Sequence, residues 1–258
     1  MQTLTSVQNP LVKAARALQT REGRVQSGLF LCEGEHMVAE ALHADASAVQ
    51  TVFVAEDCRD AYAALLAKAD RAEVFCVSAH VLEAISQVRT PQGIAATVRL
   101  PAPANPAAPG ARVVLLEAVQ DPGNVGTILR TMDAARFDAC LLSPGCADPF
   151  SPKALRATMG AVFRVPVVSV PDAAQAAATL AAQGYAVLAS VLDGDDFYRR
   201  APLPPQVCLL VGNEGAGLTP ATAAAATHRF RLPMRGGAES LNAAVAAAIF
   251  LYEIQCRG

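Results

Sequence analysis

The chain has 258 residues, of which 53% are hydrophobic and 17% are charged, and its formal net charge is -2. This length and apolar content suffice for one large core or two smaller ones, which excludes a mainly disordered chain. The slightly negative charge excludes a uniformly basic surface, so any contact with nucleic acid must come from a local basic patch.

The N-terminal region contains neither an apolar signal core nor a cleavage site of small residues. The longest apolar stretch near the C-terminus, residues 243–252, is about half as long as the roughly 20 residues that a spanning helix needs. We therefore expect a soluble, cytoplasmic protein. The seven cysteines form no C-x-x-C pair and the four histidines show no ligand spacing, so we expect neither a disulfide framework nor a metal site.

Residues 1–100 combine a polar, helical-looking start with short apolar runs at 29–32, 52–55 and 74–77. Helical stretches separate these runs, and the pattern predicts a small α/β domain.

Basic side chains gather in the first 27 residues, where Glu22 is the only acid. Lys13, Arg16, Arg21 and Arg24 are our candidates for contacts with RNA phosphates. A solvated helix face explains the same pattern equally well, because surface lysines and arginines are common.

Residues 101–110 read PAPANPAAPG, and four prolines in ten positions predict an extended linker between two domains. After it the pattern becomes regular. Strand-like apolar runs at 113–116, 139–142, 165–168, 186–190 and 207–211 are interspersed with helical segments at 127–135, 152–162 and 172–182. This alternation predicts a second domain, residues 111–258, with a mostly parallel sheet covered on both faces.

A first polar segment, DPGNVG at residues 121–126, follows the strand that ends near Glu117. We expect a tight turn there, before a helix that carries Arg130. Loops after parallel strands gather at the carboxyl edge of the sheet, where α/β proteins bind ligands. Asn124 and Arg130 are therefore candidates for contacts with a phosphate or a ribose, although an ordinary turn followed by a surface arginine is about as good an interpretation.

A second segment, GNEGAG at residues 212–217, follows the apolar run 207–211. Its spacing is not G-x-G-x-x-G, and Glu214 places a carboxylate where a pyrophosphate needs positive potential. A cationic ligand fits better, and S-adenosylmethionine carries a sulfonium and an ammonium group. Glycines let the backbone approach such a ligand closely, but a glycine-rich turn with an exposed acid is the simpler alternative.

A third segment, residues 231–242, leads into a long alanine-rich helix, with Ser240 and Asn242 at its start. These side chains and the free amides of the helix can bind a polar ligand or cap the helix, and capping is the simpler interpretation for Ser240. Apolar residues at helical spacing predict a face that belongs to the core or to a subunit interface. They are Leu241, Val245, Ala248, Ile249 and Tyr252.

Together the three segments resemble the three motifs of the SpoU (TrmH) family of SPOUT RNA methyltransferases. The first motif matches residues 121–126 with Arg130-Thr131 and Asp133-Ala134, the second matches GNEGAGL at 212–218, and the third matches LPM at 232–234 with ESLN at 239–242. Three motifs in order and near the family's spacing are specific. FLCEGE at 30–35 and TPQG at 90–93 resemble, more faintly, the small substrate-binding domain that many members carry.

The resemblance implies a trefoil-knotted α/β SPOUT domain that forms a homodimer, uses S-adenosylmethionine and follows a smaller N-terminal α/β domain that binds the RNA substrate. Knots are rare enough that only the resemblance supports one. The implied cofactor-binding residues are Val211, Gly212, Gly217, Leu232, Met234, Leu241 and Ala243. The implied catalytic residues are Asn124, Arg130, Glu214, Ser240 and Asn242.

The resemblance further implies methyl transfer to a ribose 2'-hydroxyl of structured RNA, with ribosomal RNA favoured over transfer RNA. Arginine side chains stay protonated in proteins, so we expect Arg130 to orient the hydroxyl and stabilise developing charge. We expect Glu214 either to organise the site or to pair with Arg130. Arg136 departs from the family pattern, since a glycine often ends the first motif's helix.

Three alternatives to this function stay open. A noncatalytic RNA-binding relative would keep the fold but lose turnover. A nicotinamide-dependent oxidoreductase would need a glycine fingerprint after the first strand of the second domain, which DPGNVG does not provide. A methyltransferase acting on a base nitrogen would differ around Asn124 and Ser240.

Overall fold

The structure is a computed structural model that describes residues 1–102 and 109–257. These residues form two compact units. The first unit contains Met1–Ala102 and Phe150–Phe163, and the second contains the described parts of Pro103–Pro149 and Arg164–Gly258. Most of the predicted linker, at positions 103–108, lies outside the described residues. Within the described ranges, none of the helices has the length and apolar character needed to cross a membrane.

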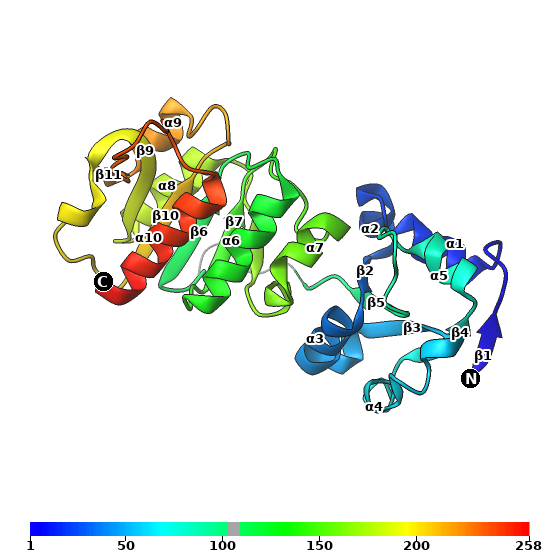
Figure 1. Ribbon diagram of the computed structural model, residues 1–258. Coiled ribbons are helices and arrows are strands. Elements are labelled where there is room, and N and C mark those ends of the chain that lie inside the picture. The colour runs from blue at the N-terminus through cyan, green and yellow to red at the C-terminus, as the bar shows by residue number, and fades with distance from the viewer. Residues whose placement is uncertain (103–108, 258) are drawn as a thin grey trace. The chain divides into compact units, whose positions relative to one another are not determined.

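The first unit is built on a mixed five-stranded sheet with strand order β1-β4-β3-β5-β2 (Figure 1). Its strands are β1 (Gln2–Leu4), β2 (Leu29–Glu33), β3 (Val49–Ala55), β4 (Glu73–Val77) and β5 (Ile94–Arg99). Its helices are α1 (Pro10–Ala17), α2 (Arg21–Ser27), α3 (Glu35–Asp45), α4 (Ala63–Leu66), α5 (Ala79–Ile85) and α7 (Pro152–Thr158). The predicted small α/β domain is confirmed.

Helix α7 and the 3₁₀ turn Ala161–Phe163 pack on the first unit, although the chain enters and leaves them from the second. Leu155 and Val162 belong to the same buried cluster as Phe30 and Val38. The rings of Phe30 and Phe150 lie 5.0 Å apart. The first unit therefore completes its core with a segment that the sequence assigned to the second domain.

The second unit is an α/β layer structure around a six-stranded sheet, ordered β11-β9-β10-β6-β7-β8. All neighbouring strands are parallel, as predicted. The strands are β6 (Arg112–Leu116), β7 (Ala139–Leu142), β8 (Val167–Ser169), β9 (Ala186–Asp196), β10 (Val207–Val211) and β11 (His228–Arg231). The helices are α6 (Pro122–Ala134), α8 (Ala173–Ala182), α9 (Pro220–Ala225) and α10 (Ala243–Arg257).

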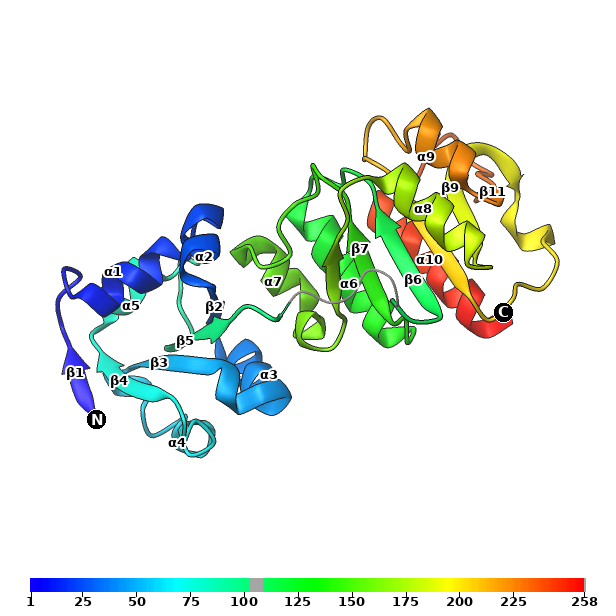
Figure 2. The ribbon, with the colours of Figure 1, turned by 180° about the vertical axis from the view of Figure 1, so that it is seen from behind.

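Helices cover both faces of this sheet, and Figures 1 and 2 show α6 and α10 on one face and α8 and α9 on the other. Because side chains alternate along a strand, each buried strand supplies both layers. Val114 and Leu116 of β6 pack with α6 and α10, whereas Val113 and Leu115 pack with α8. The knot stays a prediction.

Helix α6 begins earlier than its glycines suggested. Asp121 caps it by accepting a hydrogen bond from the Asn124 amide at 3.0 Å, and Pro122 occupies the first turn, where a missing N–H has no cost. The expected tight turn at 121–126 is thus the first turn of the helix. At its other end Arg136 adopts a left-handed backbone with φ of 54°, the conformation for which a glycine is normally selected.

Candidate functional site

The three sequence segments meet at the carboxyl ends of the parallel strands β6 and β10. Asp121 lies just beyond β6, the segment 212–217 directly follows β10, and α10 begins at Ala243 beside them. Strands β6 and β10 are neighbours, with Leu116 opposite Val211 in register. Residues about 90 positions apart in the chain are therefore brought together at one edge of the sheet.

A row of hydrogen bonds links one side chain from each segment. The Asn124 Nδ2 donates to Glu214 Oε1 at 2.9 Å, and the Asn242 Nδ2 donates to Asn124 Oδ1 at 3.0 Å. Glu214 also accepts from the backbone amides of Gln120 at 3.1 Å and Asp121 at 3.0 Å. The three polar residues predicted from three separate motifs thus form one connected network.

Burial and four hydrogen bonds act on the pKa of the Glu214 carboxyl. Burial raises it, but the hydrogen bonds from the Asn124 side chain and from the backbone amides of Asp121, Glu214 itself and Gln120 lower it by more in sum. The pKa therefore lies below its ordinary value, and Glu214 is ionised at neutral pH. Because its lone pairs are engaged by these donors, the carboxylate is fixed in position rather than free to bind a proton.

Asn242, not Ser240, caps α10. The Asn242 Oδ1 accepts from the backbone amides of Ala244 at 2.9 Å and Val245 at 3.2 Å. Ser240 lies two residues before this cap, is exposed and makes no hydrogen bond with any residue in the described ranges. The expectation that Ser240 caps the helix is wrong, and its hydroxyl is available to a ligand.

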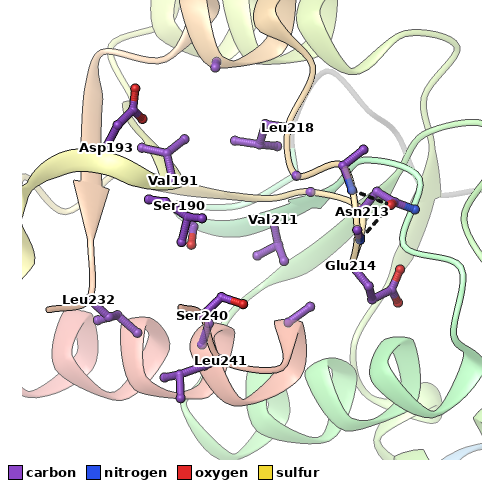
Figure 3. A pocket seen from close by; sticks show the side chains of 18 of the residues that line it. Ser190, Val191, Asp193, Val211, Asn213, Glu214, Leu218, Leu232, Ser240 and Leu241 are labelled. Atoms are coloured by element: carbon purple, nitrogen blue, oxygen red, sulfur yellow. Dashed lines mark hydrogen bonds between the residues drawn. The ribbon is translucent and has the colours of Figure 1, made fainter. Parts of the chain in front are cut away.

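A pocket of about 530 Å³ lies beside the polar row (Figure 3). This volume falls within the range of about 300–1,000 Å³ that is typical of cofactor sites. Most of the residues that line it are apolar or glycine, and polar groups come from Ser190, Asp193, Asn213, Glu214, Arg229 and Ser240. All seven residues predicted to bind the cofactor line it: Val211, Gly212, Gly217, Leu232, Met234, Leu241 and Ala243.

The glycine-rich segment forms one wall as a tight backbone turn. Asn213 and Gly217 pair with each other through N–H···O bonds of 3.0 and 2.9 Å, and the Asn213 Oδ1 accepts from the amides of Gly215 and Ala216. A Cβ at Gly212 would overlap the backbone of Gly217 and Leu218. Gly212 is therefore required by close backbone approach, which a glycine alone permits.

One residue that sequence analysis missed is Glu117, which holds the start of α9 at the pocket wall. Its buried carboxylate accepts from the Thr219 amide and hydroxyl, both at 2.8 Å, and from the Thr222 hydroxyl at 2.6 Å. These contacts tie the end of β6 to the start of α9, whose Pro220 lines the pocket. Its position at the carboxyl end of a predicted strand was the available signal.

Arg130 stands apart from this network. It lies on α6, is exposed, and makes neither a hydrogen bond nor an ion pair within the part of the chain that the structure describes. It does not line the pocket, and the donors to Glu214 are Asn124 and backbone amides instead. The guanidinium is therefore free to meet a substrate.

Three of the four basic residues that we predicted to contact RNA lie on the surface of the first unit. Lys13, Arg16 and Arg21 are exposed. Arg24, in contrast, is only 3% exposed, and its Nη1 donates to the Leu18 carbonyl at 2.7 Å, which joins α2 to the end of α1. Arg24 therefore stabilises the helical hairpin rather than extending the basic patch.

Among residues 1–102 and 109–257, no three His, Cys, Asp or Glu side chains are grouped as metal ligands.

Comparison with known proteins identifies the same two parts. Residues 111–252 match the SpoU rRNA Methylase family, and residues 9–96 match the MRM3-like substrate binding domain. The chain is 36% identical over 260 residues to the Bacillus subtilis 23S rRNA (guanosine(2553)-2'-O)-methyltransferase RlmP. This alignment covers 99% of the chain and 100% of that relative.

Solved structures agree over the whole length. A putative RNA methyltransferase of the TrmH family from Porphyromonas gingivalis superposes with a TM-score of 0.86 at 34% identity, covering 98% of this chain and 100% of the other. An AdoMet-bound rRNA methyltransferase from Sinorhizobium meliloti gives a TM-score of 0.86 at 32% identity, with 98% and 97% covered. The similarity extends across both units.

Proposed function

The chain belongs to the SpoU rRNA methylase family, and on this premise we propose how its own residues perform the reaction. It is an S-adenosylmethionine-dependent RNA 2'-O-methyltransferase that acts on ribosomal RNA. The observation that carries our assignment of the site is the row Asn242–Asn124–Glu214, which runs beside the apolar pocket.

The pocket fits the cofactor in shape and chemistry. Its apolar walls suit an adenine ring, the backbone of the segment 212–217 forms a wall without side-chain bulk, and Glu214 supplies negative charge near a sulfonium. Val211, Gly212, Gly217, Leu232, Met234, Leu241 and Ala243 would hold it. When bound, the cofactor supplies an electrophilic methyl group.

The protein's task is then to orient the ribose and weaken its 2'-hydroxyl proton. Methyl transfer requires the attacking oxygen, the methyl carbon and the sulfur in line, so fixed positioning provides much of the rate. Asn124 and Asn242 are held in place by each other, and the Ser240 hydroxyl has no competing partner in the described structure. We assign them to aligning the ribose.

Arg130 is the group that contacts the substrate's negative charge. A guanidinium has N–H donors and no acceptor, so Arg130 acts as a hydrogen-bond donor. Its free guanidinium would orient the hydroxyl and an adjacent phosphate and stabilise the charge that develops on oxygen. Glu214, which is engaged by Asn124 and two backbone amides, organises the site and does not pair with Arg130.

The first unit would bind the RNA through the exposed patch of Lys13, Arg16 and Arg21 on α1 and α2. Two neighbouring helices present these cations on a rigid hairpin, in which the Cβ of an alanine at Gly23 would overlap the Ala17 carbonyl. Such a patch fixes the position of RNA through its phosphates without reading its bases.

We propose that the protein acts in the cytoplasm.

A homodimer would form through the outer face of α10. Val245 and Tyr252 on this helix are each 49% exposed, and Leu241 just before it is 37% exposed, while Ala244, Ala247, Leu251 and Ile254 pack inward in the core. The helix is therefore apolar on two sides, and one of them is open in a single chain. An exposed apolar stripe of this kind favours a subunit interface.

The decisive experiment measures transfer of labelled methyl from S-adenosylmethionine to total RNA from a strain lacking this gene, followed by digestion to nucleosides. Wild-type protein should yield a 2'-O-methylated nucleoside, and Arg130→Ala should lower kcat by about 10²–10³-fold with unchanged cofactor binding, as expected for a lost transition-state donor. Arg136→Ala, at the end of the same helix, is the matched control. RNA binding by the wild type without any transfer would instead support the noncatalytic alternative.

A further inference from the structure

Ser190 presents an unexplained hydroxyl to the cofactor pocket. It lies on β9 and lines the pocket, and Figure 3 shows its side chain directed toward the wall formed by Leu232 and Ser240. The residue is half-buried, and its Oγ has no hydrogen-bond partner among the residues that the structure describes. The hydroxyl keeps contact with solvent, so it is open to water or to a ligand in the pocket.

Strand β9 presents different side chains to the pocket on its two faces. Because side chains alternate along β9, Ser190 and Leu192 share one face, whereas Val191 and Asp193 point the other way, as Figure 3 shows for the three that it labels. Asp193 forms an ion pair with Arg229 at 2.7 Å, and both residues also line the pocket. Ser190 therefore presents a neutral hydroxyl on the opposite face of β9 from the charged Asp193.

We propose that the Ser190 hydroxyl hydrogen-bonds the adenosine half of S-adenosylmethionine. This inference rests on the proposed placement of the cofactor in the pocket. Adenosine combines a flat ring, which packs against Val211, Leu232 and Met234, with a polar ring edge and ribose hydroxyls that can partner one side-chain hydroxyl. The amino-acid half carries an ammonium and a carboxylate, whose charges match the Asp193–Arg229 pair of the pocket lining better than a neutral hydroxyl does.

The position of the reaction centre supports the same half of the cofactor. The sulfonium methyl must lie beside Asn124 and Glu214 for transfer to the ribose, and Figure 3 shows Glu214 on the opposite side of the pocket from Ser190. Ser190 would then meet a part of the cofactor away from the reacting atoms. It is a binding residue that sets affinity and specificity rather than the chemical step.

Calorimetric titration of the full chain with two ligands tests this contact. S-adenosylhomocysteine contains both halves, whereas 5'-methylthioadenosine keeps the adenosine and lacks the amino-acid part. Ser190→Ala should weaken both ligands by the same factor, about three- to tenfold, which corresponds to one neutral hydrogen bond. Ser190→Thr, which keeps a hydroxyl and suits a strand, should restore the affinity. Ser169→Ala, on the exposed end of β8 in the same sheet, is the matched control and should bind both ligands like the wild type.

Three results would overturn the inference. Unchanged affinity of Ser190→Ala for S-adenosylhomocysteine would exclude a contact, and a loss confined to that ligand would move the contact to the amino-acid half. The hydroxyl would instead be structural if ligand-free Ser190→Ala unfolded at a lower temperature than both the wild type and Ser190→Thr and showed no selective loss of binding. If wild-type protein bound neither ligand, the placement of the cofactor itself would be refuted, which is a separate outcome.

Discussion

Asn124 and Glu214 lie 90 positions apart in the chain, and their side chains are joined by a 2.9 Å hydrogen bond from Nδ2 to Oε1. The other end of the Asn124 amide accepts from Asn242 at 3.0 Å. Because Glu214 accepts a hydrogen bond and Asn242 donates one, the side chain between them must both donate and accept, which an amide does and an ionised carboxylate cannot. Asn124 therefore links the first motif to the second through Glu214 and to the third through Asn242.

Asn124→Asp should impair the enzyme more than Asn124→Ala does. The aspartate keeps the shape and can still accept from Asn242, but it places a second negative charge against Glu214 and removes the donor. Loss of one donor to a charged partner is worth about 1.5–3 kcal/mol, so we expect kcat to fall by about 10- to 100-fold in the alanine variant and further in the aspartate variant. Methyl-transfer kinetics check the order, and an aspartate variant as active as the wild type would contradict the role assigned to the amide.

Glu214 should stabilise the fold in its ionised form. Burial opposes ionisation, but the hydrogen bonds from Asn124 and from the amides of Asp121 and Gln120 outweigh it and lower the pKa. A carboxyl with a depressed folded-state pKa adds stability that is fully present above its unfolded-state pKa, about 4.3, and is lost as the pH falls through the folded value.

Glu214→Gln should therefore lower the unfolding temperature most above about pH 5, and the difference from wild type should shrink as the pH falls below about 4. Thermal unfolding followed across this range by circular dichroism measures it. Glu239→Gln, in the third segment, is the control, since its side chain makes no hydrogen bond in the described structure. A constant difference across the whole range would show that the charge of Glu214 is not what stabilises the site.

Gly212 and Gly215 should respond differently to the same substitution. An alanine Cβ at Gly212 would overlap the backbone of Gly217 and Leu218, and backbone on both sides of the turn leaves no flexible group to move. At Gly215 the nearest atom to such a Cβ is the Asn213 Oδ1, at 3.6 Å, which is ordinary contact. Gly212→Ala should abolish measurable binding of S-adenosylhomocysteine, whereas Gly215→Ala should change its Kd by less than about threefold, which is under 1 kcal/mol. Equal behaviour of the two variants would refute a steric requirement at Gly212.

Continuous apolar runs predicted the central strands well. Strands β7 and β10 have the predicted bounds, because a fully buried parallel strand needs apolar side chains on both faces and its ends are marked by the first polar residue or glycine. The start of α6 was misplaced, because Gly123 and Gly126 suggest a turn to any local reading. Asp121 and Pro122 determine the boundary instead, through capping that the sequence contained but that competed with those glycines.

Contacts between distant segments could not be predicted from local patterns. The family resemblance placed Asn124, Glu214 and Asn242 in one site, but not the direction of the hydrogen bonds among them, which depends on β6 and β10 being neighbours. Nor does composition show that α7 completes the core of the first unit, because its Leu155 would suit either core equally. Arg24 was assigned by charge alone, and only the fold reveals that it is buried.

The basic patch on α1 and α2 should govern the salt dependence of RNA binding. Each phosphate contact made to a single-stranded region contributes about 0.7 to the slope of log K against log salt, and about 0.9 on a duplex. Changing Lys13, Arg16 and Arg21 together to glutamine should therefore reduce the slope by about 2–3. Filter binding of ribosomal RNA fragments at several salt concentrations measures it.

The control is a second triple variant, Arg59→Gln with Lys68→Gln and Arg71→Gln, which removes the same charge from exposed positions elsewhere on the first unit. If both triples reduced the slope equally, the effect would reflect net charge and not a defined patch. A reduction by the second triple alone would place the RNA on a different surface of the unit.

The outer face of α10 should decide the oligomeric state. Val245 and Tyr252 are two turns apart on that face, each 49% exposed, so a charge at either position costs a single chain little but would be buried and unpaired in a dimer. Val245→Asp with Tyr252→Asp should convert a dimer to a monomer in sedimentation equilibrium while the unfolding temperature in dilute solution changes little. Val25→Asp, which introduces the same charge at a 71% exposed apolar residue of α2, should leave the mass unchanged. A wild-type chain that sediments as a monomer at tens of micromolar would exclude α10 as the interface, and so would a double variant that keeps the wild-type mass. A different partner would then have to cover the exposed apolar side chains of Val245 and Tyr252.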